Sequence, residues 1–161
     1  MTSSNEDEQT GTKPTANDLA AILSGAQTPA SSRGINQEEL EAQYAYAFEL
    51  QQQGNHEEAL EAVSLLLNLD AWQPKFHYLC GLCLQHLSQP AAAAKTYAQA
   101  LLLDATDALT AYRMAECLAA TGDQEAAKEA LAAAINLSYA GDDQSHIKEV
   151  AETLLQHLEA I

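Results

Sequence analysis

The stretch that decides the fold runs from Leu40 to Asp70 and reads LEAQYAYAFELQQQGNHEEALEAVSLLLNLD. Apolar and small residues recur at helical spacing on both sides of Gly54-Asn55, which predicts two helices joined by a tight turn. The same arrangement returns twice without a gap, at intervals of 34 residues, in segments that start at Pro74 and Ala108. The chain is therefore built from a repeated structural unit.

Four sets of residues stay in register across the three segments. They are Ala47, Gly81 and Ala115; Leu50, Leu84 and Leu118; Gly54, Ser88 and Gly122; and Ala59, Ala93 and Ala127. Chance periodicity in an alanine-rich chain would not keep several residue types in phase. This period and these small positions resemble the tetratricopeptide repeat, a helix-turn-helix unit that stacks into a superhelix. The predicted fold is all-α, with three tetratricopeptide repeats in a right-handed superhelix, an N-terminal helix and a C-terminal capping helix.

The chain is expected to divide into four parts. These are a disordered acidic tail (1–15), an N-terminal helix and loop (16–35), three repeats (36–141, with units near 40–73, 74–107 and 108–141) and a C-terminal capping helix (142–161). In the second part, Asn17-Asp18 is predicted to cap a short helix that ends at Gly25, and the TPASSRG segment that follows is predicted to be a loop.

Start signals mark several of the expected helices. Asn36 with Glu39 predicts a capping box at the first repeat helix, from near Gln37 to near Gly54, with Ile35 stapled against Leu40. Asn55 with Glu58 predicts a second capping box. Pro74 and Pro90 fall in predicted first turns, where the amide that proline lacks would be unpaired anyway, and Asp142 and Asp143 are expected to start the last helix.

Composition excludes several classes of protein. The net charge is −16 with only seven lysines and arginines, which argues against binding to nucleic acid or to anionic lipid. Three cysteines and the lack of an apolar N-terminal signal segment suggest a reducing compartment, and no apolar run of about 20 residues could span a membrane. We expect a soluble, cytoplasmic protein.

The resemblance to tetratricopeptide repeats implies which residues line the concave wall: those at the fifth, ninth and twelfth positions of each unit. The fifth is Tyr44, Tyr78 and Tyr112, the ninth is Phe48, Leu82 and Glu116, and the twelfth is Gln51, Gln85 and Ala119. A column of three tyrosines is costly to leave in water unless a ligand docks there, so it favours a peptide groove. The alternative is that these three rings pack between neighbouring helices as part of the core. Tyr46 and Tyr97 are themselves expected in the core, because their positions in the repeat match its interior columns.

The run YAYAF at Tyr44 to Phe48 and the AECL motif at Ala115 to Leu118 resemble the class II chaperones of bacterial type III secretion systems. The order of parts is similar over almost the whole chain. The resemblance implies a cytoplasmic, non-enzymatic virulence chaperone that binds an extended N-terminal segment of a translocator, with proline and leucine anchors. That translocator would be the partner, and the chaperone would form a homodimer.

Carried over by position, the resemblance implies a set of groove residues and a set of dimer contacts. The groove residues are Tyr44, Phe48, Gln51, Lys75, Tyr78, Leu82, Gln85, Tyr112 and Glu116, and the dimer contacts are Leu19, Ile22 and Leu23. The apolar residues would anchor the segment, and Gln51, Lys75, Gln85 and Glu116 would supply polar contacts to its backbone.

Other chemistry has little support in the sequence. Cys80 and Cys83 form a CxxC inside a predicted helix with no second CxxC, so buried packing cysteines are favoured over zinc or redox chemistry. The histidines lack metal-ligand spacing, and no nucleophile elbow, phosphate loop or catalytic carboxylate pair is present. Neither a cofactor nor a metal is expected, and the protein is not expected to be an enzyme.

Two alternatives remain within binding proteins: a type III needle-subunit chaperone, and a generic tetratricopeptide interaction module. A module that clamps a carboxyl terminus needs lysine and asparagine where this chain has Tyr44 and Phe48, and only Arg113 fits. A structural scaffold, a different class, would have a polar groove in place of the tyrosine column.

Overall fold

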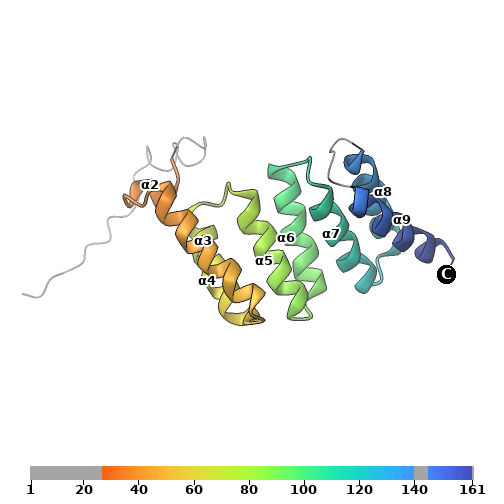
Figure 1. Cartoon of the computed structure of the whole chain (residues 1–161), viewed down its shortest axis with the longest axis horizontal. Helices are drawn as coiled ribbons and strands as arrows, with labels where there is room; N and C mark the ends of the chain where they lie inside the picture. Colours follow the sequence, from red (N-terminus) through yellow and green to blue (C-terminus); the bar gives the residue numbers. More distant parts are fainter. Residues whose placement is uncertain (1–26, 140–144, 161) are drawn as a thin grey trace, which may run out of the picture.

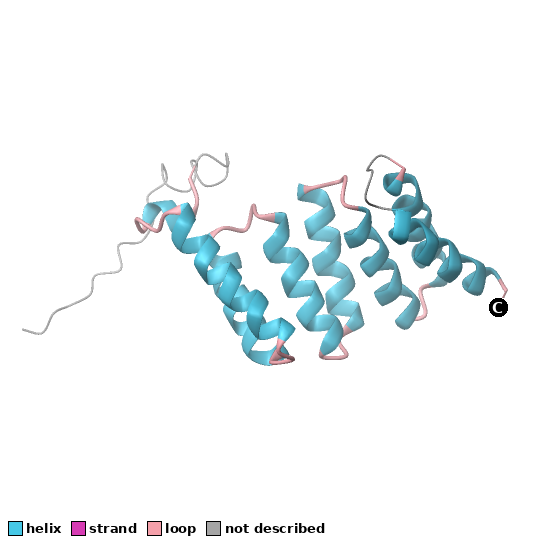
Figure 2. Ribbon diagram, viewed as in Figure 1, coloured by secondary structure: helices cyan, strands magenta, loops and turns pink. Residues whose placement is uncertain are grey.

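The computed structural model describes residues 27–139 and 145–160, and these form a row of helices with no strand among them (Figures 1 and 2). The helices are α2 (Pro29–Ser32), α3 (Gln37–Gln52), α4 (His56–Leu69), α5 (Pro74–His86), α6 (Pro90–Leu103), α7 (Ala108–Ala120), α8 (Gln124–Ser138) and α9 (Ser145–Glu159). From α3 onward each helix packs against the next, so the row runs from α2 at one end to α9 at the other. The predicted all-α repeat fold is confirmed.

The three turns inside the helix pairs have the same geometry. Gly54, Ser88 and Gly122 all adopt positive φ, at 83°, 58° and 85°. In each case the next amide returns to a carbonyl five residues earlier, as in the bond from Asn55 to Leu50 at 2.9 Å. This closes the helix in the manner of a Schellman motif. The turn is thus repeated every 34 residues, although Ser88 adopts a conformation that costs a side chain more than it costs glycine.

The predicted helix starts are partly confirmed. Asn36 accepts from the Glu39 amide and the Glu39 carboxylate accepts from the Asn36 amide, both at 2.9 Å, which makes the capping box at α3. Pro74 and Pro90 open α5 and α6. The prediction of a second capping box is wrong, because the Asn55 side chain forms no hydrogen bond with the start of α4. The backbone of Asn55, at ψ 62°, belongs to the preceding turn, where its amide donates to the carbonyl of Leu50.

Two further differences concern the ends of the chain. The segment TPASSRG, expected as a loop, contains the four-residue helix α2, because Thr28 and Ser31 form a capping box around Pro29. The predicted N-terminal helix, with Leu19, Ile22 and Leu23, lies outside the described residues, as do Asp142 and Asp143. The described part of the last helix begins at Ser145.

Packing follows the in-register small residues. Ala47, Ala59, Ala93, Ala115 and Ala127 are fully buried, so the helices approach closely at each of them. At Gly81 the approach is closer still, because a Cβ there would lie 2.8 Å from ring atoms of the buried Tyr97. Small side chains therefore set the spacing between the helices, as expected for this repeat.

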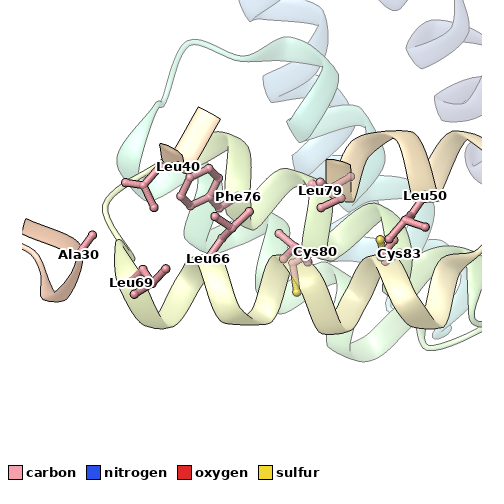
Figure 3. Packing of buried hydrophobic residues seen from close by; sticks show 12 residues of the cluster. Ala30, Leu40, Leu50, Leu66, Leu69, Phe76, Leu79, Cys80 and Cys83 are labelled. Carbon is pink, nitrogen blue, oxygen red and sulfur yellow. The ribbon is translucent and has the colours of Figure 1, made fainter. Parts of the chain in front are cut away.

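The buried side chains form two main cores with different compositions. The N-terminal core, drawn in Figure 3, consists of Ala30, Leu40, Ala47, Leu50, Ala59, Val63, Leu66, Leu69, Phe76, Leu79, Cys80 and Cys83. The C-terminal core consists of Ala111, Ala115, Ala127, Ala130, Leu131, Ala134, Ala151 and Leu158. A smaller cluster around Tyr97 lies between repeats 2 and 3. Of the helices described, none combines the length and the apolar character that crossing a membrane requires.

Candidate peptide-binding face

The three tyrosines at the fifth position of the repeats come from equivalent places on α3, α5 and α7. Tyr44, Tyr78 and Tyr112 are each half-buried, so each ring is held by neighbours and still reaches the surface. We call the surface they form the tyrosine face. The other two tyrosines separate clearly from it. Tyr97 is fully buried, as predicted, whereas the prediction for Tyr46 is wrong because its side chain is 61% exposed.

At the end formed by repeat 1, the tyrosine face is a small aromatic cluster. The ring of Tyr44 stacks on Phe48 with centroids 6.2 Å apart and packs against Phe76 at 5.7 Å. Phe48 is 39% exposed, which leaves apolar surface open at the ninth position. The Lys75 ammonium lies 4.9 Å from the centre of the Tyr44 ring and forms an ion pair with Glu41. This lysine is therefore held between an aromatic ring and a carboxylate.

Where repeats 2 and 3 meet, a hydrogen-bond network forms the polar part of the face. Arg113 Nη1 donates to Glu116 Oε2 at 3.0 Å, and Gln85 Nε2 donates to the same oxygen at 3.2 Å. The Tyr97 hydroxyl in turn donates to Gln85 Oε1 at 3.0 Å. Gln85 and Glu116, expected to meet a ligand backbone, are thus bound to one another across α5 and α7. Remaining hydrogen-bonding capacity at these groups would be available to a peptide.

Arg113 has a larger place at this face than the sequence suggested. Its guanidinium pairs with Glu116 and also lies beside Tyr78, where it favours the ionised phenol and partly opposes the effect of burial on the Tyr78 pKa. The signal available in the sequence was its position next to Tyr112 in the tyrosine column. The sequence indicated Arg113 only as the one residue that fits a carboxylate clamp, and Tyr44 and Phe48 stand where such a clamp needs lysine and asparagine.

Burial raises the pKa of all three face tyrosines, Tyr44, Tyr78 and Tyr112. Each therefore remains a neutral phenol at neutral pH, able to donate one hydrogen bond and to accept others. A surface of neutral phenol groups and aromatic ring edges suits an extended segment with apolar side chains, because the hydroxyls can satisfy its carbonyls.

Two of the predicted groove residues are buried. Leu82 and Gln51 are 9% and 7% exposed, so in this structure they support the face from below. Cys80 and Cys83 also lie in the interior, as packing residues of the N-terminal core. Burial raises the pKa of Cys83 to about 11, which leaves it a protonated thiol at neutral pH.

This chain is similar, in sequence and in fold, to proteins of type III secretion systems. Residues 40–73 match the family model of the tetratricopeptide repeat. The Low calcium response locus protein H of Yersinia pestis is 28% identical over 156 residues, covering 97% of this chain and 91% of its own. A type III secretion complex from Aeromonas hydrophila superposes with a TM-score of 0.86 at 25% identity, covering 89% of this chain and 96% of that one.

A third relative is SycD, the type III secretion chaperone of Yersinia enterocolitica. Its structure in complex with a peptide of the translocator YopD has a TM-score of 0.75 at 25% identity, covering 78% of this chain and 96% of that one. The chain is similar to type III secretion translocator chaperones. SycD has also been solved as an alternative dimer, with a TM-score of 0.74. The resemblance stated from the sequence is therefore confirmed, both by sequence and by fold.

Proposed function

We propose that this protein is a type III secretion chaperone that binds an extended segment of a translocator on its tyrosine face. The observation that carries the proposal is that every repeat places a half-buried tyrosine at the same point of its first helix. Support comes from the peptide of the translocator YopD that the similar protein SycD binds. The bound segment is expected to be N-terminal in the translocator and to carry proline and leucine anchors.

The physical role follows from the nature of the cargo. A translocator is destined for a membrane, so its apolar segments would aggregate or insert too early if they were left uncovered. Covering one segment on an aromatic face removes that surface from water without consuming ATP. Each well-buried anchor contributes about 2 kcal/mol, so a few anchors give an affinity that a secretion apparatus can still reverse.

The groove residues take distinct roles in this proposal. Tyr44, Phe48, Tyr78 and Tyr112 supply apolar contacts and phenol hydroxyls, and Lys75, Gln85 and Glu116 supply charge and hydrogen bonds at the edges. Leu82 and Gln51 hold the shape of the face from beneath. We therefore expect substitution of the tyrosines to weaken binding most, because their rings are the accessible part of the face.

Three further properties belong to the proposal. The protein works without catalysis, in the bacterial cytoplasm, where its cargo is made. It forms a homodimer, and Leu19, Ile22 and Leu23, which lie outside the described residues, are proposed to provide the contact. Its net charge of −16 keeps it from nucleic acids and anionic membranes.

The test is a pull-down from the source bacterium with the wild type and with Tyr78→Ala, the recovered proteins being identified by mass spectrometry. We expect wild type to recover a secreted protein with apolar membrane-seeking segments, and Tyr78→Ala to bind it about tenfold or more weakly, as for a hot-spot residue. Tyr44→Ala/Tyr78→Ala should lose it completely.

Tyr46→Ala is the matched control, since Tyr46 lies on α3 as Tyr44 does but is exposed away from the core. It should bind cargo like wild type. Circular dichroism must show unchanged helicity in every variant, because loss of helix in Tyr78→Ala would assign that ring to the core. Recovery of a small needle-like subunit in place of a translocator would overturn the proposed cargo.

A further inference from the structure

A pocket of about 180 Å³ opens beside Tyr78, between α5, α6 and the start of α7. Its lining residues are Pro74, Lys75, Tyr78, Ala100, Asp104, Asp107 and Thr110. The volume is below that of an ordinary small-molecule site and suits one long side chain. Because Tyr78 belongs both to this pocket and to the tyrosine face, a segment bound on the face could insert a side chain here.

The pocket combines apolar walls with carboxylates. Pro74, Ala100 and the ring of Tyr78 provide the apolar part, and Asp104 and Asp107 provide the charge. The negative end of the α6 dipole lies at Asp104, its C-cap residue, whereas Asp107 caps the positive N-terminus of α7. Apolar walls with an acidic end match the side chain of a lysine or arginine, which carries a cation on an apolar stem.

Repeat 1 has an equivalent site, in which Asp70 corresponds to Asp104 and accepts a hydrogen bond from within the chain. There Gln73 Nε2 donates to Asp70 Oδ2 at 2.9 Å, and the Lys75 ammonium sits over Tyr44 and pairs with Glu41. Gln73 thus satisfies Asp70, the counterpart of Asp104, whereas Lys75 pairs with Glu41, whose counterpart one repeat later is Lys75 itself.

In repeat 2 both of these internal groups are replaced. The residues one repeat after Gln73 and Lys75 are Asp107 and Leu109, an acceptor and an apolar side chain. Asp104 Oδ1 accepts from Thr106, and Asp107 accepts from Leu109, Thr110 and the Thr110 hydroxyl as the cap of α7. Among the described residues nothing donates to Asp104 Oδ2.

The neighbouring cations are engaged elsewhere. Lys75 lines the pocket, but its ammonium pairs with Glu41 on α3 and lies over the ring of Tyr44. Arg113 pairs with Glu116 and does not line the pocket. In the part of the chain that the structure describes, neither Asp104 nor Asp107 forms an ion pair.

We propose that this pocket receives a lysine or arginine side chain of the bound translocator segment, and so sets its register on the tyrosine face. This inference rests on the proposed function. The cation would lie against the ring of Tyr78 and pair with Asp104 and Asp107, at the place where Gln73 donates to Asp70 in repeat 1. A basic residue among the apolar anchors would then be required for tight binding.

The test is a double-mutant cycle on short overlapping peptides of the translocator recovered by pull-down, with each lysine or arginine replaced in turn by norleucine. Binding of the tightest peptide is measured by calorimetry on the wild type and on Asp104→Asn. We expect one norleucine replacement to weaken binding to wild type about tenfold, as for hydrogen bonds between charged groups. The same replacement should change binding to Asp104→Asn by much less.

One control variant keeps the test specific. Asp123→Asn removes the same charge from the cap of α8, outside the pocket, and should leave the cost of norleucine unchanged.

The outcomes separate the two proposals. If peptides bind on the tyrosine face but no norleucine replacement matters, or if its cost is the same in Asp104→Asn, the chaperone function stands and the basic-anchor pocket is wrong. If no translocator peptide binds the wild type at all, both proposals fail.

Discussion

The N-terminal and C-terminal cores solve the same packing problem with different side chains. Large residues such as Leu66, Phe76 and Leu79 fill the N-terminal core, whereas six of the eight buried residues in the C-terminal core are alanines. Alanines let helices approach closely but bury less apolar surface per residue. The C-terminal core compensates with α9, whose Ala151 and Leu158 complete it.

This difference teaches that one repeat backbone tolerates two ways of filling space, with opposite weaknesses. A core of large side chains is sensitive to the loss of volume, because a cavity is left behind. A core of alanines is sensitive to added volume, because its helices are already in close contact and leave no space for a larger side chain. The tyrosine face spans both, so its geometry depends on each.

The largest effect is expected from Phe76→Ala in the N-terminal core. Phe76 is fully buried and also supports Tyr44, so truncation removes apolar burial and leaves a cavity. We expect a loss of about 3–5 kcal/mol in the free energy of unfolding, measured by urea denaturation. Leu102→Ala, at a side chain that is 86% exposed, should stay within about 0.5 kcal/mol of wild type. If the two variants lost equal amounts of stability, the N-terminal core would not have the proposed sensitivity to lost side-chain volume.

The next effect is overpacking of the C-terminal core by Ala127→Leu. Ala127 on α8 is fully buried where α7 approaches, so a larger side chain must push the helices apart. We expect a loss of about 1–3 kcal/mol by the same measurement. Ala132→Leu makes the identical change at an exposed position of α8 and should have almost no effect. A stabilising Ala127→Leu would mean that this core is underpacked.

Features fixed by local geometry were predictable from the sequence. The turns at Gly54 and Gly122 require positive φ, and the box of Asn36 with Glu39 needs only a helix start. The small residues that recur every 34 positions were predictable for a related reason, since every repeat must close on its neighbour. These signals depend on few residues and were sufficient to specify the fold.

Features that depend on distant partners were not predictable in this way. Tyr46 was expected inside because its phase matched an apolar column, but an alanine-rich helix offers several such phases and the neighbouring helices select one. The network of Arg113, Glu116 and Gln85 joins residues from two repeats, so no local pattern indicates it. The pocket beside Tyr78 likewise depends on three helices meeting. The roles of the face residues in binding stay predictions.

Gly81→Ala tests the junction between the two cores. The added methyl group would meet the ring of Tyr97, which is buried in the cluster between repeats 2 and 3. Overpacking is expected to cost about 1–3 kcal/mol, and the better helix propensity of alanine to return up to about 1 kcal/mol. A net loss of about 1 kcal/mol should appear in urea denaturation. Adding Tyr97→Leu should make the two changes less than additive, because the clash is then relieved.

The smallest effect is an acid sensitivity that should belong to the N-terminal half. His56 and His86 stack there with centroids 4.4 Å apart and planes within 8°. Burial, then the charges of His56 and Arg113, lower the pKa of His86 below its usual 6.5. The unfolded chain therefore binds this proton more readily, so stability is complete above about pH 6.5 and falls as the pH decreases toward the folded-state pKa.

Thermal unfolding between pH 7.5 and pH 5.5 measures this contribution of His86. Because His86 is largely exposed, solvent weakens the effect, and we expect a decrease in Tm of no more than about 2 °C. His86→Gln should remove that decrease, since the variant carries no titrating group at this position. His146→Gln, on the exposed surface of α9, should retain it. If His146→Gln were the variant that flattened the pH profile, the acid sensitivity would lie in the C-terminal half, and the stacked pair would not be its origin.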